Sequence, residues 1–274
     1  MKIYGIDFTS SPSRRKPITC IACELDGAKL NVGALLEWEN FDVFEAALNE
    51  PGPWLAGIDF PFGQARRFIE TIGWPDNWRD YVLHASAMGR ETFVDTLNEY
   101  RSARPAGDKE HRRQTDKAAS SISPQKLYGV PVGKMFFEGA PRLIKAEVTV
   151  PGLQVGDPDR IVVEAYPGFM ARNLVGRRSY KNDTKNKQTP ALHQARLDIF
   201  EALKGDDVTS VYGIEVTAPS SLVDDPSADH LDALLCAVQA AWSWNQRNNR
   251  FGEPPGSDPL EGWIADPLLK YPLG

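Results

Sequence analysis

The stretch "WLAGIDFPFG", residues 54–63, decides the fold class of this chain. It is an apolar run that ends in an acid, and its Gly-Ile-Asp-Phe repeats residues 5–8, within "KIYGIDF". In each copy the Asp closes a predicted strand, and the residue two positions earlier, on the same face, is Gly. If both strands are buried and parallel, Asp7 and Asp59 lie at one carboxyl edge of a sheet, where α/β proteins place ligands.

Strand and helix patterns alternate around this stretch. Residues 17–25 and 29–38 are predicted strands joined by a turn at Asp26-Gly27, and residues 41–49 form a short amphipathic helix. A later apolar strand is "RIVVEAYPG", residues 160–168. We therefore expect an α/β fold in one domain spanning residues 1–274. Residues 64–100 are predicted to be mostly helical and 101–126 a polar loop, which places an insertion at about 64–150, and a Pro- and Gly-rich tail at about 250–274 is expected to wrap the body.

Composition is that of an ordinary globular protein, with 42% hydrophobic and 25% charged residues. No apolar run reaches the length of a membrane span, and the start "MKIYGIDF" lacks a secretory signal. Three cysteines cannot build a disulfide framework, so we expect a cytoplasmic protein without a membrane role. Cys20 and Cys23 fall on opposite faces of one predicted strand, which argues against a redox or zinc site there.

The net charge of −6 gives no global sign of nucleic-acid binding, but cations gather in two segments, residues 101–134 and 172–187. A third small group, residues 14–16, follows Asp7 directly. These segments suit a locally bound anion such as a phosphate backbone. Solvated loops kept soluble by their lysines are an equally common explanation.

Further acids lie where they could join Asp7 and Asp59. Glu164 closes the strand at 160–164, and Asp229 and Asp232 open the helix of "SADHLDALLCAVQAAW", residues 227–242. Ser227 is a plausible N-cap for this helix. The helix is apolar on all sides and should be buried, so Asp232 needs a cation, a set of donors or an opening to water. Carboxylates in a chain with only four histidines suit Mg²⁺ or Mn²⁺ better than zinc.

The order of these motifs resembles a known family. The matching stretches are "GIDF", "AGIDFPFG", "VVEAYPG" followed by "SYK" and "ARLDIF", then "DHLDALLCAVQAAW" and "EGWI". Together they resemble an uncharacterised bacterial and archaeal family described as predicted ribonuclease H-like nucleases. The resemblance covers nearly the whole chain and implies a ribonuclease H-like mixed five-stranded sheet flanked by helices, with a helical insertion. It also implies two divalent metals held by acids on the first strand, the fourth strand and the last helix.

By this resemblance Asp7 is the ligand shared between the metals, with Asp59 and Asp232 as partners and Glu164 and Asp229 as further members. The identity of the fifth strand stays open, because Glu215 in "YGIEV" is a rival for the place of Glu164. Lys181 is the first candidate to steer the water or stabilise the transition state, and His230 is the second. The implied function is hydrolysis of phosphodiester bonds in RNA, DNA or a hybrid with Mg²⁺ or Mn²⁺.

Two other classes of protein compete with a nuclease. "GIDFTSSP", residues 5–12, is similar to the first phosphate loop of actin-like sugar kinases, but the second Asp-x-Gly loop and the Gly-Gly adenosine turn of those enzymes are missing from the sequence. A scaffold or binding protein of the same fold that kept its acids is the other alternative, because a metal site does not prove cleavage. ATP binding would identify a kinase, and metal-dependent activity would separate the nuclease from the scaffold.

Overall fold

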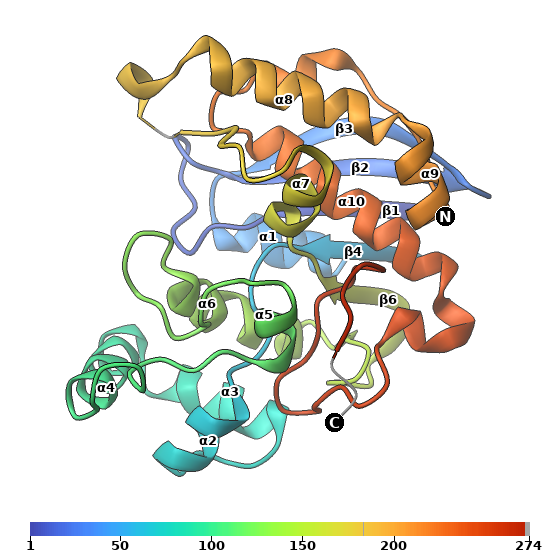
Figure 1. The fold of residues 1–274 in the computed structure, drawn as a ribbon. Helices are drawn as coiled ribbons and strands as arrows, with labels where there is room; N and C mark the ends of the chain where they lie inside the picture. The colour runs from blue at the N-terminus through green and yellow to red at the C-terminus, as the bar shows by residue number, and fades with distance from the viewer. Residues whose placement is uncertain (183, 272–274) are drawn as a thin grey trace.

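A seven-stranded mixed sheet forms the centre of the protein in a computed structural model, which describes residues 1–182 and 184–271 (Figure 1). The strand order across the sheet is β5-β6-β4-β1-β2-β3-β7. The strands are β1 (Lys2–Asp7), β2 (Ile18–Asp26), β3 (Lys29–Trp38), β4 (Trp54–Ile58), β5 (Val148–Thr149), β6 (Asp157–Glu164) and β7 (Glu215–Thr217).

β2 runs antiparallel to both β1 and β3, and the turn predicted at Asp26-Gly27 joins β2 to β3. Gly27 adopts φ +59°, a conformation that glycine reaches without strain. On the other side of β1 lie β4 and then β6, both parallel to it, so the condition set for Asp7 and Asp59 is met. The predicted count of five strands was wrong. The two additional strands, β5 and β7, lie at the edges and have only two and three residues, and β7 falls within "YGIEV", which the sequence had left open as a strand.

Helices cover both faces of the sheet, which makes three layers (Figure 1). One face packs against α7 (Pro167–Val175), α8 (Pro190–Leu203), α9 (Asp206–Tyr212) and α10 (Asp229–Asn245). The other face shares a hydrophobic core with α1 (Phe41–Leu48), α2 (Arg66–Ile72), α3 (Trp78–Ala87), α4 (Arg90–Ser102) and α6 (Val132–Lys145), in which α3 and α4 pack on α6. The remaining helices are α5 (Gln114–Ala118) and three short 3₁₀ segments, Lys185–Lys187, Ser220–Val223 and Arg247–Gly252.

The buried helix α10 lies directly on the two motif strands. A Cβ at Gly5 would overlap the backbone O of Ala233 and the backbone N of Ala237. A Cβ at Gly57 would lie 2.5 Å from the backbone O of Cys236. The glycines of the repeated motif therefore let the helix backbone approach the sheet. The helix fills the space beside these two glycines.

We predict that Gly5→Ala lowers the free energy of unfolding by about 1–3 kcal/mol, because the added methyl group meets helix backbone that cannot move away alone. Urea unfolding followed by circular dichroism measures the change. Gly33→Ala is the matched control, because a Cβ there approaches only the backbone O of Ala22, at 3.1 Å. Equal stability of the two variants would contradict this account of the packing.

The insertion and the tail meet at the end of β6. The insertion supplies α2 to α6, and the tail returns along the sheet so that Ile264 pairs in parallel with Glu164. Trp263 is buried and its indole N–H donates to the carbonyl of Pro151 at 3.1 Å. Trp263 and Ile264 of the tail thus pack on the body. Within residues 1–182 and 184–271, no helix is long and apolar enough to cross a membrane.

Candidate functional site

Four aspartates converge at the carboxyl edge of the sheet, on the face that carries α10. Asp7 is the last residue of β1, and Asp59 follows β4, where its backbone N–H donates to the carbonyl of Ile6 at 3.0 Å. Asp229 and Asp232 lie in the first turn of α10, whose N-terminus points to the same edge. The pKa of Asp7 is affected by each of the other three carboxylates, which places all four in one electrostatic cluster.

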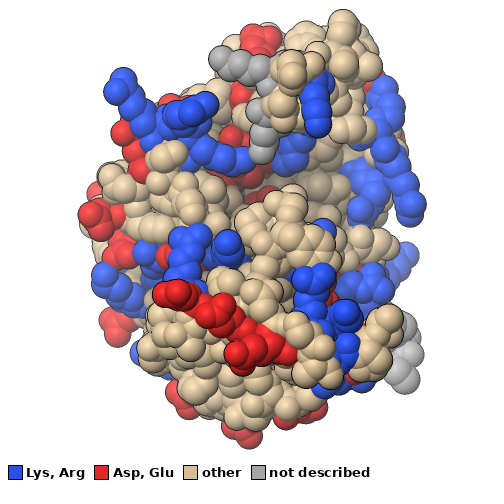
Figure 2. Space-filling model, turned by 90° about the vertical axis from the view of Figure 1, so that its left-hand side faces the viewer, with Lys and Arg blue, Asp and Glu red and all other residues tan. Residues whose placement is uncertain are grey.

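Figure 2 shows this edge of the molecule. A hollow separates the upper and lower halves, with acidic side chains deep inside it and Lys and Arg side chains along its margins. A cavity of about 350 Å³ within it is lined by Asp7, Asp59 and Asp229 together with Lys16 and Lys181. The arrangement suits an anionic ligand that approaches the acids through a cation.

The N-terminus of α10 differs from the sequence prediction. Ala228 occupies the N-cap position with φ +63°, and its side chain cannot cap. Ser227 is not the cap, because its hydroxyl donates to Asp225. Asp225 accepts the backbone N–H of His230 at 3.3 Å and supplies the negative charge that a helix N-terminus favours. Asp229 is therefore free of the capping role.

Asp232 is fully buried and has both a donor and a cation. The hydroxyl of Tyr180 donates to Asp232 Oδ1 at 2.7 Å, and the ammonium of Lys181 forms an ion pair with Oδ2. Burial alone would lower the pKa of Lys181, but the charges of Asp232, Tyr180 and Asp7 and the hydrogen bond to Asp232 together raise it well above its usual value. The Lys181 side chain remains 43% exposed, so its ammonium bridges the buried acid and the hollow.

The other three acids are held in an electrostatically unfavourable state. Burial raises the pKa of Asp7 well above its usual value, and the neighbouring charge of Asp229 raises it further. Burial also raises the pKa of Asp59, to about 7, and that of Asp229. Among the described residues, no hydrogen bond or ion pair engages these three carboxylates. Such a cluster gains stability from an added cation.

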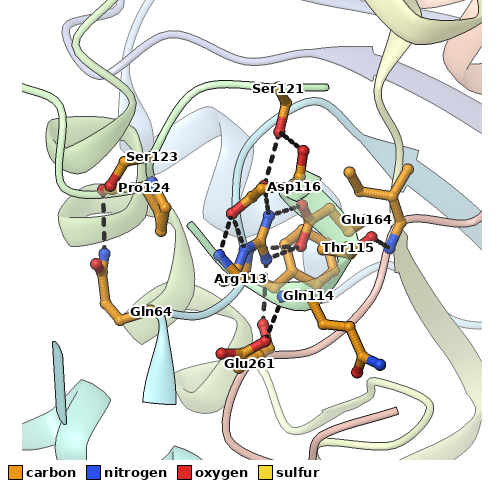
Figure 3. Close-up of polar contacts among 12 residues, drawn as sticks. Gln64, Arg113, Gln114, Thr115, Asp116, Ser121, Ser123, Pro124, Glu164 and Glu261 are labelled. Atoms are coloured by element: carbon orange, nitrogen blue, oxygen red, sulfur yellow. Dashed lines mark hydrogen bonds and ion pairs between the residues drawn. The ribbon is translucent and has the colours of Figure 1, made fainter. Parts of the chain in front are cut away.

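Glu164 is taken up by a different interaction. The guanidinium of the fully buried Arg113 forms two hydrogen bonds to its carboxylate, at 2.6 and 2.7 Å, and the backbone N–H of Phe62 adds a third at 2.8 Å (Figure 3). The same guanidinium binds Asp116 through two nitrogens at 3.0 Å. Burial opposes the charge of Arg113, but Asp116 and Glu164 together raise its pKa well above its usual value. We name Arg113, Asp116 and Glu164 the arginine clamp.

The alternation of side chains along β6 explains why Glu164 leaves the cluster. Gly57 pairs with Val163 in the sheet, so the position two residues beyond, next to Asp59, belongs to Ala165. Glu164 shares its face with Val162, which packs against the opposite side of the sheet from α10. Glu215, the rival for this place, is exposed and pairs with Lys29 at the start of β3, at the other edge of the sheet.

The arginine clamp also fastens the tail. Arg113 donates to the carbonyl of Glu261 at 3.1 Å, and the carboxylate of Glu261 accepts the backbone N–H groups of Gln114 and Arg66 at 2.6 and 2.8 Å. Arg113 stands in the basic segment that the sequence suggested for phosphate binding. The sequence showed the positive charge of this segment but not that its central cation is buried.

Several of the other candidate cations are also paired. Arg101 faces Glu110 at 3.5 Å, Arg104 pairs with Asp108, and Arg178 pairs with Asp198 at 2.7 Å. His230, the second candidate for a catalytic role, lies 3.8 Å from Glu37. Lys16 and Lys181 are the candidate cations that line the cavity beside Asp7.

Within the insertion, His111 is a buried histidine that should make stability depend on pH. Its Nε2 lies 2.7 Å from the hydroxyl of Tyr100. Burial lowers its pKa, and the cations Arg67, Arg104 and Lys117 lower it further, while Asp108 opposes them. The depressed pKa means that the folded protein favours the neutral ring.

The resulting stability is complete above the unfolded pKa of about 6.5 and is lost as pH falls towards the folded pKa. We expect His111→Gln to reduce the loss of unfolding free energy between pH 7.5 and 5. Urea titrations of both proteins at several pH values test this. A variant that retains the full wild-type slope in this window would show that His111 is not the source.

The donor chemistry of the aspartate cluster fits a hard divalent cation, because it offers only carboxylate oxygens and three of the four acids have no hydrogen-bond or ion-pair partner among residues 1–182 and 184–271. A preassembled site is absent: within residues 1–182 and 184–271, no group of three or more His, Cys, Asp or Glu side chains is placed to hold a metal ion. Metal binding at this edge would therefore require the carboxylates to close together and Lys181 to release Asp232.

Comparison with known proteins gives one result. Residues 5–256 match the profile of a family described as "Protein of unknown function (DUF429)". The chain belongs to this family. All four clustered aspartates and the whole arginine clamp lie within the matched residues. No curated protein and no solved structure matches the chain.

Proposed function

We propose that this DUF429 protein is a divalent-metal-dependent nuclease and that Asp7, Asp59, Asp229 and Asp232 form its metal site. The observation that carries the proposal is the convergence of four carboxylates, three of them without a hydrogen-bond or ion-pair partner in the described part of the chain, in a hollow flanked by cations. Mg²⁺ or Mn²⁺ bound there would supply Lewis-acid stabilisation of a phosphodiester and an activated water.

The protein's own contribution is charge and position. Asp7 and Asp59 are fixed by strands whose backbones are hydrogen-bonded to each other, and Asp232 by a buried helix, so these three carboxylates start from rigid elements. Lys181 balances the charge of Asp232 and, once displaced, would face the phosphate from the hollow. Glu164 supports the site through the arginine clamp in this proposal and is not a metal ligand.

We further infer that the core of the fold is ribonuclease H-like. Three consecutive antiparallel strands followed by the parallel pair β4 and β6 support this inference, and so does the position of the acids at the end of β1 and the start of the last long helix. The short edge strands β5 and β7 would be additions to that core.

The test is a cleavage assay of the purified full-length protein. Labelled single strands, duplexes, RNA–DNA hybrids and a four-way junction are incubated with Mn²⁺ or Mg²⁺, with an EDTA lane for each substrate. We expect cleavage of at least one substrate that EDTA abolishes. Calorimetric Mn²⁺ binding without cleavage of any substrate would favour a non-catalytic metal protein, and absence of Mn²⁺ binding would refute the metal site.

A further inference from the structure

A second cavity adjoins the aspartate cluster and differs from it in character. It has a volume of about 470 Å³, within the range of pockets that bind small molecules. Asp59 stands at one side of it, and most of its wall is apolar. The apolar lining includes Pro61, Ile122, Val130, Val132, Met135 and Ile264.

The two cavities lie side by side, because both are lined by Asp59, Lys181, Val130 and Met135. An apolar chamber and a charged chamber thus flank the same carboxylate. A ligand that fits both must have an apolar, flat or compact part joined within a few bonds to an anionic part. A nucleotide unit has this design, with its base joined through the sugar to a phosphate.

Tyr166 is the aromatic side chain available in the apolar chamber. Phe60 also lines it but is buried in a ring cluster with Phe8 and Phe62, and the hydroxyl of Tyr180 is bonded to Asp232. Tyr166 is half-buried, and Gly168 makes room for its ring, since a Cβ there would lie 3.1 Å from Cε2. Aromatic rings bind unstacked bases of any type through their faces.

The polar groups in the chamber are few and mostly engaged. Arg113 and Asp116 of the arginine clamp line it but satisfy each other, and Ser121 donates to Asp116 at 2.9 Å. Lys126 adds positive charge to the lining, and Arg178 also lines it but is paired with Asp198. The chamber therefore favours an apolar ring and attracts the phosphates attached to it, without a hydrogen-bonding pattern that selects one base.

We propose that this chamber receives one unstacked base of a single-stranded nucleic acid whose adjoining phosphate lies at the aspartate cluster. The proposal rests on the proposed function and narrows it: the substrate is a single strand, a loop or a frayed end, because a base within a continuous duplex cannot leave its stack without an energetic penalty. RNA and DNA are both compatible with the chamber.

Binding of abasic oligonucleotides tests the proposal without cleavage. Fluorescently labelled 12-nucleotide single strands carry one abasic site that is moved along the sequence, and anisotropy gives the affinity at low salt with Ca²⁺, a hard cation that binds the same carboxylate oxygens. We expect binding to weaken about 5- to 100-fold when the base that enters the chamber is missing, and little at other positions. Tyr166→Ala should remove this position dependence, and Tyr166→Phe, which keeps the ring, should retain it.

Filling the chamber gives an independent variant. Val130→Trp should weaken single-strand binding and flatten the abasic scan, because Val130 lines both cavities and its exposed position tolerates a larger side chain. Val155→Trp is the matched control, since Val155 is 99% exposed and lines neither cavity. It should bind as the wild type does.

The proposal of a base-binding chamber would be overturned if the wild-type affinity did not depend on the position of the abasic site, or if a duplex bound as tightly as the single strand. Neither result touches the metal site, which is tested by Mn²⁺ calorimetry and cleavage. Loss of the metal site together with an intact abasic profile would reject the nuclease while keeping a single-strand binding protein. The two proposals therefore fail in distinguishable ways.

Discussion

Asp7→Asn is expected to weaken Mn²⁺ binding at least about 100-fold and to abolish any metal-dependent cleavage. The estimate is a lower bound, because loss of even an outer-shell partner of a metal ligand typically reduces affinity 10- to 100-fold. Asp7 is the acid whose pKa responds to all three other members of the cluster, so it occupies the electrostatic centre of the site. Calorimetric titration with Mn²⁺ and the cleavage assay measure the two effects.

Asp7→Asn should at the same time fold as well as the wild type or better, since it removes a buried charge that its neighbours repel. Its melting temperature shows whether a loss of Mn²⁺ binding comes from a loss of folding.

Glu164→Gln separates the role of the aspartate cluster from that of the arginine clamp. It should lower the melting temperature but leave the Mn²⁺ affinity of the folded protein within about threefold, a smaller change than the loss of an outer-shell partner produces. A strong loss of affinity in Glu164→Gln would return Glu164 to the set of metal ligands.

Arg113→Leu is expected to lower the free energy of unfolding by about 3–5 kcal/mol, the usual effect of removing one partner of a buried ion pair. Arg113 is 1% exposed and neutralises Asp116 and Glu164, so its loss leaves two buried carboxylates without a cation. It also releases the carbonyl of Glu261 and with it the docked tail. Chemical unfolding monitored by tryptophan fluorescence measures the change.

Arg101→Leu is the matched control for the arginine clamp. Arg101 lies in the same basic segment, but its side chain is 41% exposed and its ion pair with Glu110 is 3.5 Å long, so its removal should change stability by less than about 1 kcal/mol. The free energy of unfolding of Arg113→Lys should lie between those of the wild type and Arg113→Leu, because an ammonium keeps the charge but cannot form two parallel pairs of hydrogen bonds. Equal stabilities of the Leu variants would show that the clamp carries no special stability.

The sequence predicted the direction of the Cys20 and Cys23 side chains correctly, but it did not predict that the Glu164 side chain points away from Asp7 and Asp59. Two residues three apart on a strand must face opposite sides, and Cys20 and Cys23 do lie in separate buried clusters on the two faces of the sheet. The same alternation, applied across paired strands, determines on which face of the sheet the Glu164 side chain lies. Applying it needs the register between β4 and β6, which depends on pairing between residues more than a hundred positions apart.

The sequence by itself determined the class of fold and most of the cluster. Each repeated Gly-Ile-Asp-Phe carries the period-two pattern of a buried strand and its terminal acid, and the helix that begins near Asp229 is apolar on all sides and had to be buried. These are local signals, so they need no knowledge of partners. Asp7, Asp59, Asp229 and Asp232 followed from them together with the family resemblance.

Only the tertiary structure decided what each buried charge does. Lys181 neutralises Asp232, Arg113 removes Glu164 from the cluster, and the glycines of the motif bring α10 onto the strands. Each of these outcomes depends on which distant groups share a low-dielectric interior, where an ion must find a partner. The local sequence pattern therefore does not predict which partner each buried charge has.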